Sequence, residues 1–237
     1  MYVKLAQLKA TPPSASLVVE TDGKLYRVYS EKHHGACVTA DSLDGALGRI
    51  DGEINALWSW AKGKPIALTY EHTIVERHEV GYPLDGLRSE ILFGIEQGTF
   101  HAITYRIMKE LAVRSALAMT QLLDSIPDAG APLTGSPLMR EIGTAAEVRR
   151  ITYFSTGAFV RKLGIEYENT GDIYANRMFA LAAAETDKFM RNLPHTEYGE
   201  TWTLRKVLRR LIWQDRLLAR ALFDAAREKW GDRIANP

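Results

Sequence analysis

The chain has only one cysteine, Cys37, so it cannot form an internal disulfide or a metal site built from several cysteines. Its 30 basic and 29 acidic residues nearly balance, which leaves no global field to attract nucleic acid or an anionic membrane. No stretch approaches the ~18 consecutive apolar residues of a membrane-spanning helix. The first residues also lack the pattern of a signal peptide. These absences predict a cytoplasmic protein without membrane contacts, and they make nucleic acid an unlikely partner.

Signatures of nucleotide binding and of nucleophilic catalysis are missing as well. The sequence has no GxSxG, P-loop or GxGxxG motif. Cys37 falls in a predicted strand, where a free cysteine more often packs as a small apolar residue than acts as a nucleophile. Of the histidines, His33 and His34 are adjacent, whereas His72 and His78 are too far apart along an extended chain to chelate one ion. The residues therefore predict no catalytic group and no cofactor, although a metal site assembled from separated histidines stays open.

The first third of the chain has the pattern of a small mixed sheet. Asp22-Gly23 separates two β-branched or alternating runs and is typical of a hairpin turn. A helical repeat of apolar residues follows and stops at Gly63, which favours a helix end. The predicted elements are strands at residues 16–20, 25–30 and 36–40, a helix at 42–62 and a strand at 66–80. The predicted order is β-β-β-α-β.

That order, with VVETDGKLYRVYS and GACVTADSLDGAL, resembles the HicB-like antitoxin domain over about residues 16–64. In that family an ExDGxY hairpin leads to a Pro-Gly-Cys turn and a TxEEA helix start. This chain departs from the pattern twice, with His34-Gly35-Ala36-Cys37 at the turn and Gly45 in place of a capping glutamate. The family fold is a reduced RNase H-like sheet without catalytic carboxylates. The resemblance therefore implies binding rather than chemistry.

Small residues share one face of the predicted 42–62 helix: Gly45, Gly48, Gly52 and Ala56. On a solvated face each glycine lowers helix stability by about 0.5–1 kcal/mol relative to alanine, with no contact to compensate. We therefore expect this face to pack against another backbone, either the C-terminal half of the chain or a second copy in a homodimer. The alternative is a weak surface helix.

Residues 83–237 have the pattern of a four-helix bundle. The turn-rich segment 81–86 is the predicted boundary between a domain at 1–82 and a domain at 83–237. Thr144 with Glu147 predicts a capping box, and Thr203 predicts an N-cap. The predicted helices span 99–124, 144–163, 172–192 and 199–229, the third with Phe189 and Met190 among its buried residues.

The last helix, GETWTLRKVLRRL, resembles the final helix of DinB-like four-helix bundles, and the resemblance extends over about residues 84–230. In that family two histidines on this helix and one on the second helix bind a divalent metal. Here Ile151, Gln214 and Leu218 stand at those positions, which implies a degenerate metal site. A remnant pocket is expected around Gln214, with Tyr153 and Asp215 beside it, for a small polar molecule.

The opposite face of the last helix carries Arg205, Arg209, Arg216 and Arg220, which we expect to form a solvated, salt-bridged surface. The sequence thus favours an α+β, two-domain protein that is non-catalytic and binds an unidentified protein or small-molecule partner, in a binding or regulatory role. Two alternatives stay open. One is a metal-dependent DinB-like enzyme, a thiol transferase or hydrolase with displaced ligands. The other is an antitoxin-like regulator linked to nucleic acid through the HicB-like domain.

Overall fold

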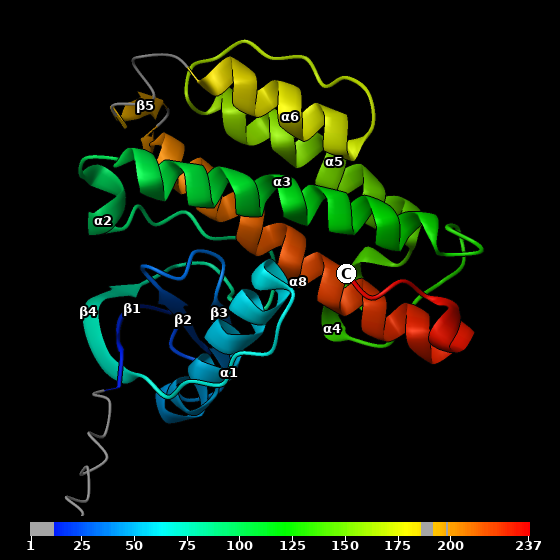
Figure 1. Ribbon diagram of the computed structural model, residues 1–237, viewed down its shortest axis with the longest axis horizontal. Coiled ribbons are helices and arrows are strands. Elements are labelled where there is room, and N and C mark those ends of the chain that lie inside the picture. The colour runs from blue at the N-terminus through cyan, green and yellow to red at the C-terminus, as the bar shows by residue number, and fades with distance from the viewer. Residues whose placement is uncertain (1–11, 186–191, 198) are drawn as a thin grey trace, which may run out of the picture.

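The chain adopts an α+β fold in a computed structural model that describes residues 12–185, 192–197 and 199–237. Figure 1 shows a sheet part (residues 12–80) below a helical part (residues 102–237), with a connecting segment (residues 81–101) between them. Within the described ranges no helix is both long enough and apolar enough to cross a membrane.

The sheet part has the predicted order of elements. They are β1 (Ser14–Thr21), β2 (Tyr26–Ser30), β3 (Cys37–Ala40), α1 (Leu43–Lys62) and β4 (Glu71–Glu79). The strands lie in the order β3-β2-β1-β4, and β4 runs parallel to β1 because α1 carries the chain back across the sheet. At the β1–β2 turn, the Asp22 carboxylate accepts hydrogen bonds from the backbone N–H groups of Lys24 and Leu25, and Gly23 has a φ of 84°. The Asp-Gly hairpin is thus confirmed.

The helical part contains four longer helices that pack in a ring. It begins after the short helix α2 (Gly94–Gln97) and comprises α3 (Ala102–Asp124), α4 (Pro137–Ile142), α5 (Ala145–Arg161), α6 (Ile173–Ala184), the strands β5 (His195–Glu197) and β6 (Glu200–Trp202), and α8 (Leu204–Trp230). Helix α3 contacts α6 and α8, and α5 contacts the same two helices. Thr203 is the N-cap of α8, since its hydroxyl accepts a hydrogen bond from the Lys206 backbone N–H.

Several boundaries differ from the sequence predictions. Strand β4 starts at Glu71 rather than at residue 66, because the Asn55 side chain exchanges hydrogen bonds with the backbone of Leu68 and holds that stretch beside α1. The capping box of α5 is half made. Thr144 accepts from the Glu147 backbone N–H, but the Glu147 carboxylate pairs with Arg150. Helix α4 lies between the predicted helices at 99–124 and 144–163, where no helix was predicted. Helix α6 ends at Ala184, and Phe189 and Met190 lie outside the described residues.

Both faces of the sheet are covered, which explains why β1 is buried along most of its length. Leu17 and Val19 share an apolar cluster with α1. Val18 and Tyr29, which are paired across β1 and β2, point to the other face and pack with Trp213 of α8. The connecting segment lies on this second face, so the sheet part and the helical part share one packed interior.

Arginine and lysine side chains hold the connecting segment from two sides by donating hydrogen bonds to its backbone carbonyl oxygens. From the sheet, Arg27 donates to the carbonyls of Leu84, Gly86 and Arg88. From α8, each of four cations donates to one carbonyl: Arg210 to Leu87, Lys206 to Glu90, Arg209 to Ile91 and Arg205 to Ile95. Residues 81–86, the predicted boundary, lie at the start of this segment, and their chain is fixed by these bonds.

The expectation that the arginine face of α8 is solvated is wrong for three of its four members. Arg205 and Arg209 are buried and the Arg216 side chain is only 12% exposed, whereas Arg220 is 53% exposed. The connecting segment covers Arg205 and Arg209 and supplies their carbonyl acceptors, whereas Glu53 and Trp60 of α1 shield Arg216. Arg209 also forms a buried ion pair with Glu96. Burial acts to lower the pKa of Arg209, but the Glu96 carboxylate outweighs it, and the pKa is raised.

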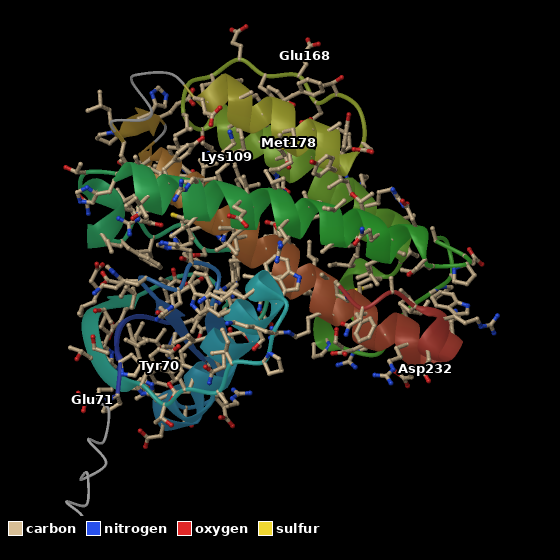
Figure 2. The ribbon with its side chains drawn as sticks, viewed as in Figure 1. Tyr70, Glu71, Lys109, Glu168, Met178 and Asp232 are labelled. Atoms are coloured by element: carbon tan, nitrogen blue, oxygen red, sulfur yellow. The ribbon has the colours of Figure 1, made fainter. Side chains whose placement is uncertain are left out.

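Replacing Arg209 with Met should lower the free energy of unfolding by about 3–5 kcal/mol, because Glu96 would stay buried without its partner. The matched control is Arg227→Met on the same helix. Arg227 pairs with Asp232 at the exposed C-terminal end of α8 (Figure 2), where an ion pair contributes little. Urea denaturation followed by circular dichroism measures both. Equal losses in the two variants would contradict the structural role of the Arg209–Glu96 pair.

Candidate ligand-binding site

A buried polar cluster lies among the four longer helices, and each helix contributes one side chain. Arg177 of α6 pairs with Asp215 of α8, with 3.0 Å between Arg177 Nη1 and Asp215 Oδ2. Ser115 of α3 donates a hydrogen bond to Asp215 Oδ2 at 2.8 Å. Arg177 Nε donates to Thr156 of α5 at 3.1 Å. The cluster therefore ties all four helices together through one ion pair.

The ion pair is almost completely removed from water. Arg177 is 0% exposed and Asp215 is 1% exposed. A buried charge is tolerated only where its hydrogen-bonding groups find partners. Arg177 meets this condition, because Thr156, Asp215 and the Ala112 carbonyl together accept from Nε, Nη1 and Nη2. The hydrogen-bond donors of Arg177 thus have acceptors, and the pair has a structural role.

Beside this cluster is a cavity of about 190 Å³ between α1, α3, α8 and the C-terminal segment. Figure 1 shows the C-terminal end of α1 reaching the middle of α8, below α3. Asp215 and Ser115 lie at the polar inner wall of the cavity. The other walls have two aromatic rings, three small side chains and two residues of the C-terminal segment: Trp60, Phe223, Ala56, Ala118, Ala219, Asn236 and Pro237. We call this space the α1–α3–α8 cavity.

Two arginines lie at the rim of the cavity. Arg216 and Arg220 share the single carboxylate of Glu53, at 3.1 Å and 2.8 Å. Arg216 also lies over the ring of Trp60, 5.3 Å from its centroid. Burial lowers the pKa of Arg216, and the Glu53 charge only partly offsets this. The Nε–H of Arg216 is buried and has no acceptor among the residues that the structure describes.

The structure does not place the three residues of the predicted remnant pocket in one cavity. Asp215 lines the α1–α3–α8 cavity. Tyr153 instead lines a surface hollow of about 290 Å³ that also includes Arg149 and Ile173. Gln214 is buried in the helical part and lines neither space. The α1–α3–α8 cavity is therefore not the predicted pocket around Gln214, since it includes only Asp215 of the three residues.

Ile151, Gln214 and Leu218 stand at the metal-ligand positions of the DinB-like family. They do not converge on an open site. Leu218 belongs to an apolar cluster of the helical part, and Ile151 packs against the same cluster. Their hydrocarbon side chains, with the amide of Gln214, do not fit a divalent metal, which prefers imidazole, carboxylate or thiolate donors. Among the described residues, no group of three or more His, Cys, Asp or Glu is arranged to hold a metal ion.

The small-residue face of α1 is not packed against the helical part. A Cβ atom added at Gly48 or Gly52 would meet no described atom within 4 Å, and both glycines are exposed. At Gly45 the added atom would lie 2.9 Å from the hydroxyl of Ser42, the N-cap of the same helix. Ala56 is exposed and lines the α1–α3–α8 cavity. Packing of this face against a second copy of the chain stays a prediction.

The titratable residues singled out from the sequence have local partners. His33 accepts a hydrogen bond from the indole N–H of Trp58, with 2.7 Å between Trp58 Nε1 and His33 Nδ1. His34 is buried beside Arg205 and Arg209, and burial, with these charges and that of His33, lowers its pKa to about 3. Burial also raises the pKa of the Cys37 thiol to about 12, which keeps it protonated. None of these groups lines the α1–α3–α8 cavity.

No protein-family model, curated protein or solved structure matches this chain. The resemblances to HicB-like and DinB-like domains therefore stay predictions from the sequence. The case for a function rests on the geometry of the α1–α3–α8 cavity.

Replacing Asp215 with Asn should lower the free energy of unfolding by about 3–5 kcal/mol, because the Arg177 charge would be left buried without a counter-charge. Combining Asp215→Leu with Arg177→Met removes both charges and should recover most of that loss. Urea denaturation of wild type, single variant and double variant gives the comparison. A double variant that is much less stable than Asp215→Asn would show that the pair itself is not the source of the effect.

His34 should make the protein less stable in acid. Its folded pKa is about 3, below the ordinary value of 6.5, so the unfolded chain binds more protons between these values. The associated stability is present above pH 6.5 and is lost as the pH falls toward 3. His34→Gln should therefore show a shallower decline of unfolding free energy from pH 6.5 to pH 4 than wild type, as measured by urea titrations at each pH. Parallel declines in the two proteins would assign the acid sensitivity to other groups.

Proposed function

We propose that this chain is a non-catalytic binding protein whose ligand is a small molecule held in the α1–α3–α8 cavity. In this proposal the sheet part is HicB-like, and the helical part is a DinB-like bundle with a degenerate metal site. The observation that carries the proposal is the cavity itself, which has apolar walls, a few convergent polar groups and a preformed shape. Sites for small molecules commonly have this composition.

The position of the cavity supports a regulatory role for the ligand. Trp60 and Ala56 belong to α1 of the sheet part, whereas Ala118 and Phe223 belong to helices of the helical part. A molecule in the cavity contacts both parts at once. Because its binding free energy adds to the folded state alone, occupancy stabilises their packing. The ligand would thus act on the arrangement of the two parts without being chemically changed.

The packing of α8 leaves its arginine face unsuited to binding a phosphate backbone. Arg205 and Arg209 donate to backbone carbonyls of the connecting segment, and both are buried. Phosphate recognition needs cations that reach solvent and displace counterions. The two arginines are committed to the interior, so the face that could have followed a phosphate backbone is covered.

Filling the cavity should abolish ligand binding. Wild type and Ala118→Phe would be screened by thermal unfolding against a panel of small polar and charged metabolites. A ligand at 100 times its Kd stabilises the folded state by about 2.7 kcal/mol, which corresponds to a Tm increase of roughly 5–10 °C at this chain length. We expect compounds that raise the Tm of wild type and leave that of Ala118→Phe unchanged.

The matched control is Ala158→Phe, which adds the same side chain at an exposed position of α5 outside the cavity. This variant should keep the wild-type response to every hit. If Ala118→Phe responds as Ala158→Phe does, the hits bind elsewhere and the proposed site is wrong. Circular dichroism of both variants confirms that each is folded before the screen.

A further inference from the structure

We propose that one face of α6 binds the same face of a second copy of this chain, so that two copies associate through an antiparallel pair of α6 helices. Helix α6 packs against α3 and α5, and Figure 1 shows it at the side of the helical part that lies away from the sheet part. The outer face of α6 consists of six residues that are at least partly exposed: Tyr174, Ala175, Met178, Phe179, Ala182 and Ala183.

The polarity of α6 is the reverse of that of an ordinary surface helix. Such a helix buries an apolar stripe and exposes its charged residues. In α6 the strongly polar side chains of Asn176 and Arg177 are each 0% exposed. Met178 and Phe179, in contrast, are 38% and 57% exposed, and no charged side chain between Ile173 and Ala184 reaches solvent. The outer face of α6 is therefore an apolar surface in contact with water.

Partners in the interior fix this orientation of α6. Arg177 forms the buried ion pair with Asp215. The Asn176 amide donates to the backbone carbonyl of Tyr153, and its oxygen accepts from the hydroxyl of Tyr167. Rotating α6 to bury its apolar side would break the ion pair and these hydrogen bonds, which is strongly unfavourable. The apolar face thus stays outward in the folded chain.

The neighbouring helices expose charges where α6 does not. Arg106 and Glu110 are exposed on α3, and Arg150 and Arg161 are exposed on α5. Single apolar side chains on a protein surface are ordinary, whereas a contiguous apolar patch marks a site of association. The contrast with α3 and α5 therefore assigns an association surface to the outer face of α6.

The area of this surface fits a weak dimer. Helix α6 has 12 residues and is about 18 Å long, so half of its surface is roughly 350 Å². Val113 and Leu117 of α3 extend the surface, because they follow Lys109 at intervals of four residues, and Lys109 pairs with Glu185 beside the end of α6. Two copies together remove about 700–1,000 Å² from water, which is typical of a transient association.

A second copy fits the surface because large and small side chains match under a two-fold axis. With the axis between Met178 and Phe179, Tyr174 lies opposite the partner's Ala183. Ala175 lies opposite the partner's Ala182, and these small side chains let the two helices approach closely. Met178 and Phe179 then interdigitate with the same residues of the partner at the centre. Every residue of the outer face is used in this pairing.

Charge also allows two copies to approach. Charge complementarity steers many pairs of unlike proteins, and the outer face of α6 offers none. At one end of the helix Glu185 is paired with Lys109. At the other end Asp172 accepts a hydrogen bond from the Ala175 backbone N–H, where the helix dipole stabilises a negative charge. The pairing therefore brings together little unbalanced charge of like sign.

Sedimentation velocity of the full chain over about 5–500 μM tests the association. We expect the average mass to rise from that of a monomer toward that of a dimer, with a Kd on the order of 100 μM. Phe179→Glu should raise this Kd at least about tenfold, because it places a charge in an apolar contact. A wild type that stays monomeric over the whole range would overturn the proposal.

The matched control is Phe154→Glu, the same substitution at a position of α5 that is 50% exposed and lies outside the outer face of α6. This variant should associate as wild type does. Circular dichroism confirms that both variants are folded, which is expected because each replaced ring is at least half exposed. The cavity has no residue of α6 in its lining, so the ligand screen gives the same answer in all these proteins.

A disulfide tests the antiparallel arrangement. The double variant Ala175→Cys, Ala182→Cys should form covalent dimers under mild oxidation, as seen on non-reducing gels. Within one chain the two positions lie two turns apart, about 10 Å along the helix, which is too far for a disulfide. Each single variant should stay monomeric for the same reason, since its cysteine lies two turns from that of the partner. Cys37 is present in every variant, and wild type measures its contribution.

The outcomes separate the face from its arrangement. If Phe179→Glu associates as wild type does, another surface, such as the exposed glycines of α1, joins the copies and the proposal is wrong. Loss of association in Phe179→Glu without a disulfide in the double variant contradicts the antiparallel pairing. Loss in Phe179→Glu alone, together with the disulfide in the double variant alone, supports both.

Discussion

Hydrogen bonds from cations to backbone carbonyls of the connecting segment hold the two parts of this molecule together. Among the described residues, this layer contains Arg27, Arg205, Lys206, Arg209 and Arg210 but only two buried carboxylates, Glu20 and Glu96. Carbonyl dipoles compensate the remaining positive charge. The compensation is incomplete, since burial lowers the pKa of Lys206 to about 8 and that of Arg210 to about 10. The sheet, the connecting segment and α8 consequently pack as successive layers.

Local signals in the sequence predict much of the fold, because they act within a few residues. The hydroxyl of Thr203 caps α8 as expected, and Gly63 ends α1 in a left-handed conformation. Whether the arginine face of α8 is buried or solvated does not depend on residues that are close in the sequence. A charged stripe looks the same in sequence whether water or backbone carbonyls accept its hydrogen bonds. The acceptors here come from residues more than 100 positions away, as in the pair Arg209–Ile91.

The residues of the candidate site are likewise only partly predictable from local signals in the sequence. Asp215, which lines the α1–α3–α8 cavity, is named from the sequence only as a neighbour of Gln214 in the remnant pocket, and that pocket stays a prediction. Ser115 and Arg177 were missed, and Arg216 was predicted to be solvated, because the pattern of an amphipathic helix does not distinguish a buried polar residue from a solvated one. A cavity between three helices depends on where the helices cross. The spacing of residues along one helix does not predict these crossing points. Packing within the chain does not explain why positions 48 and 52 are glycine, because Gly48 and Gly52 are both exposed.

The two-sided burial of the sheet has a consequence for how the protein is made. The strands β1 and β2 leave the ribosome early, but Trp213, which covers Val18 and Tyr29, is synthesised near the end. Until then the nascent chain presents an apolar face and the buried pair Glu20–Arg27 to solvent. Unfinished sheets of this kind are prone to misassociation, and this exposure lasts until α8 emerges. The sheet part is thus fully covered only after α8 of the helical part has been synthesised.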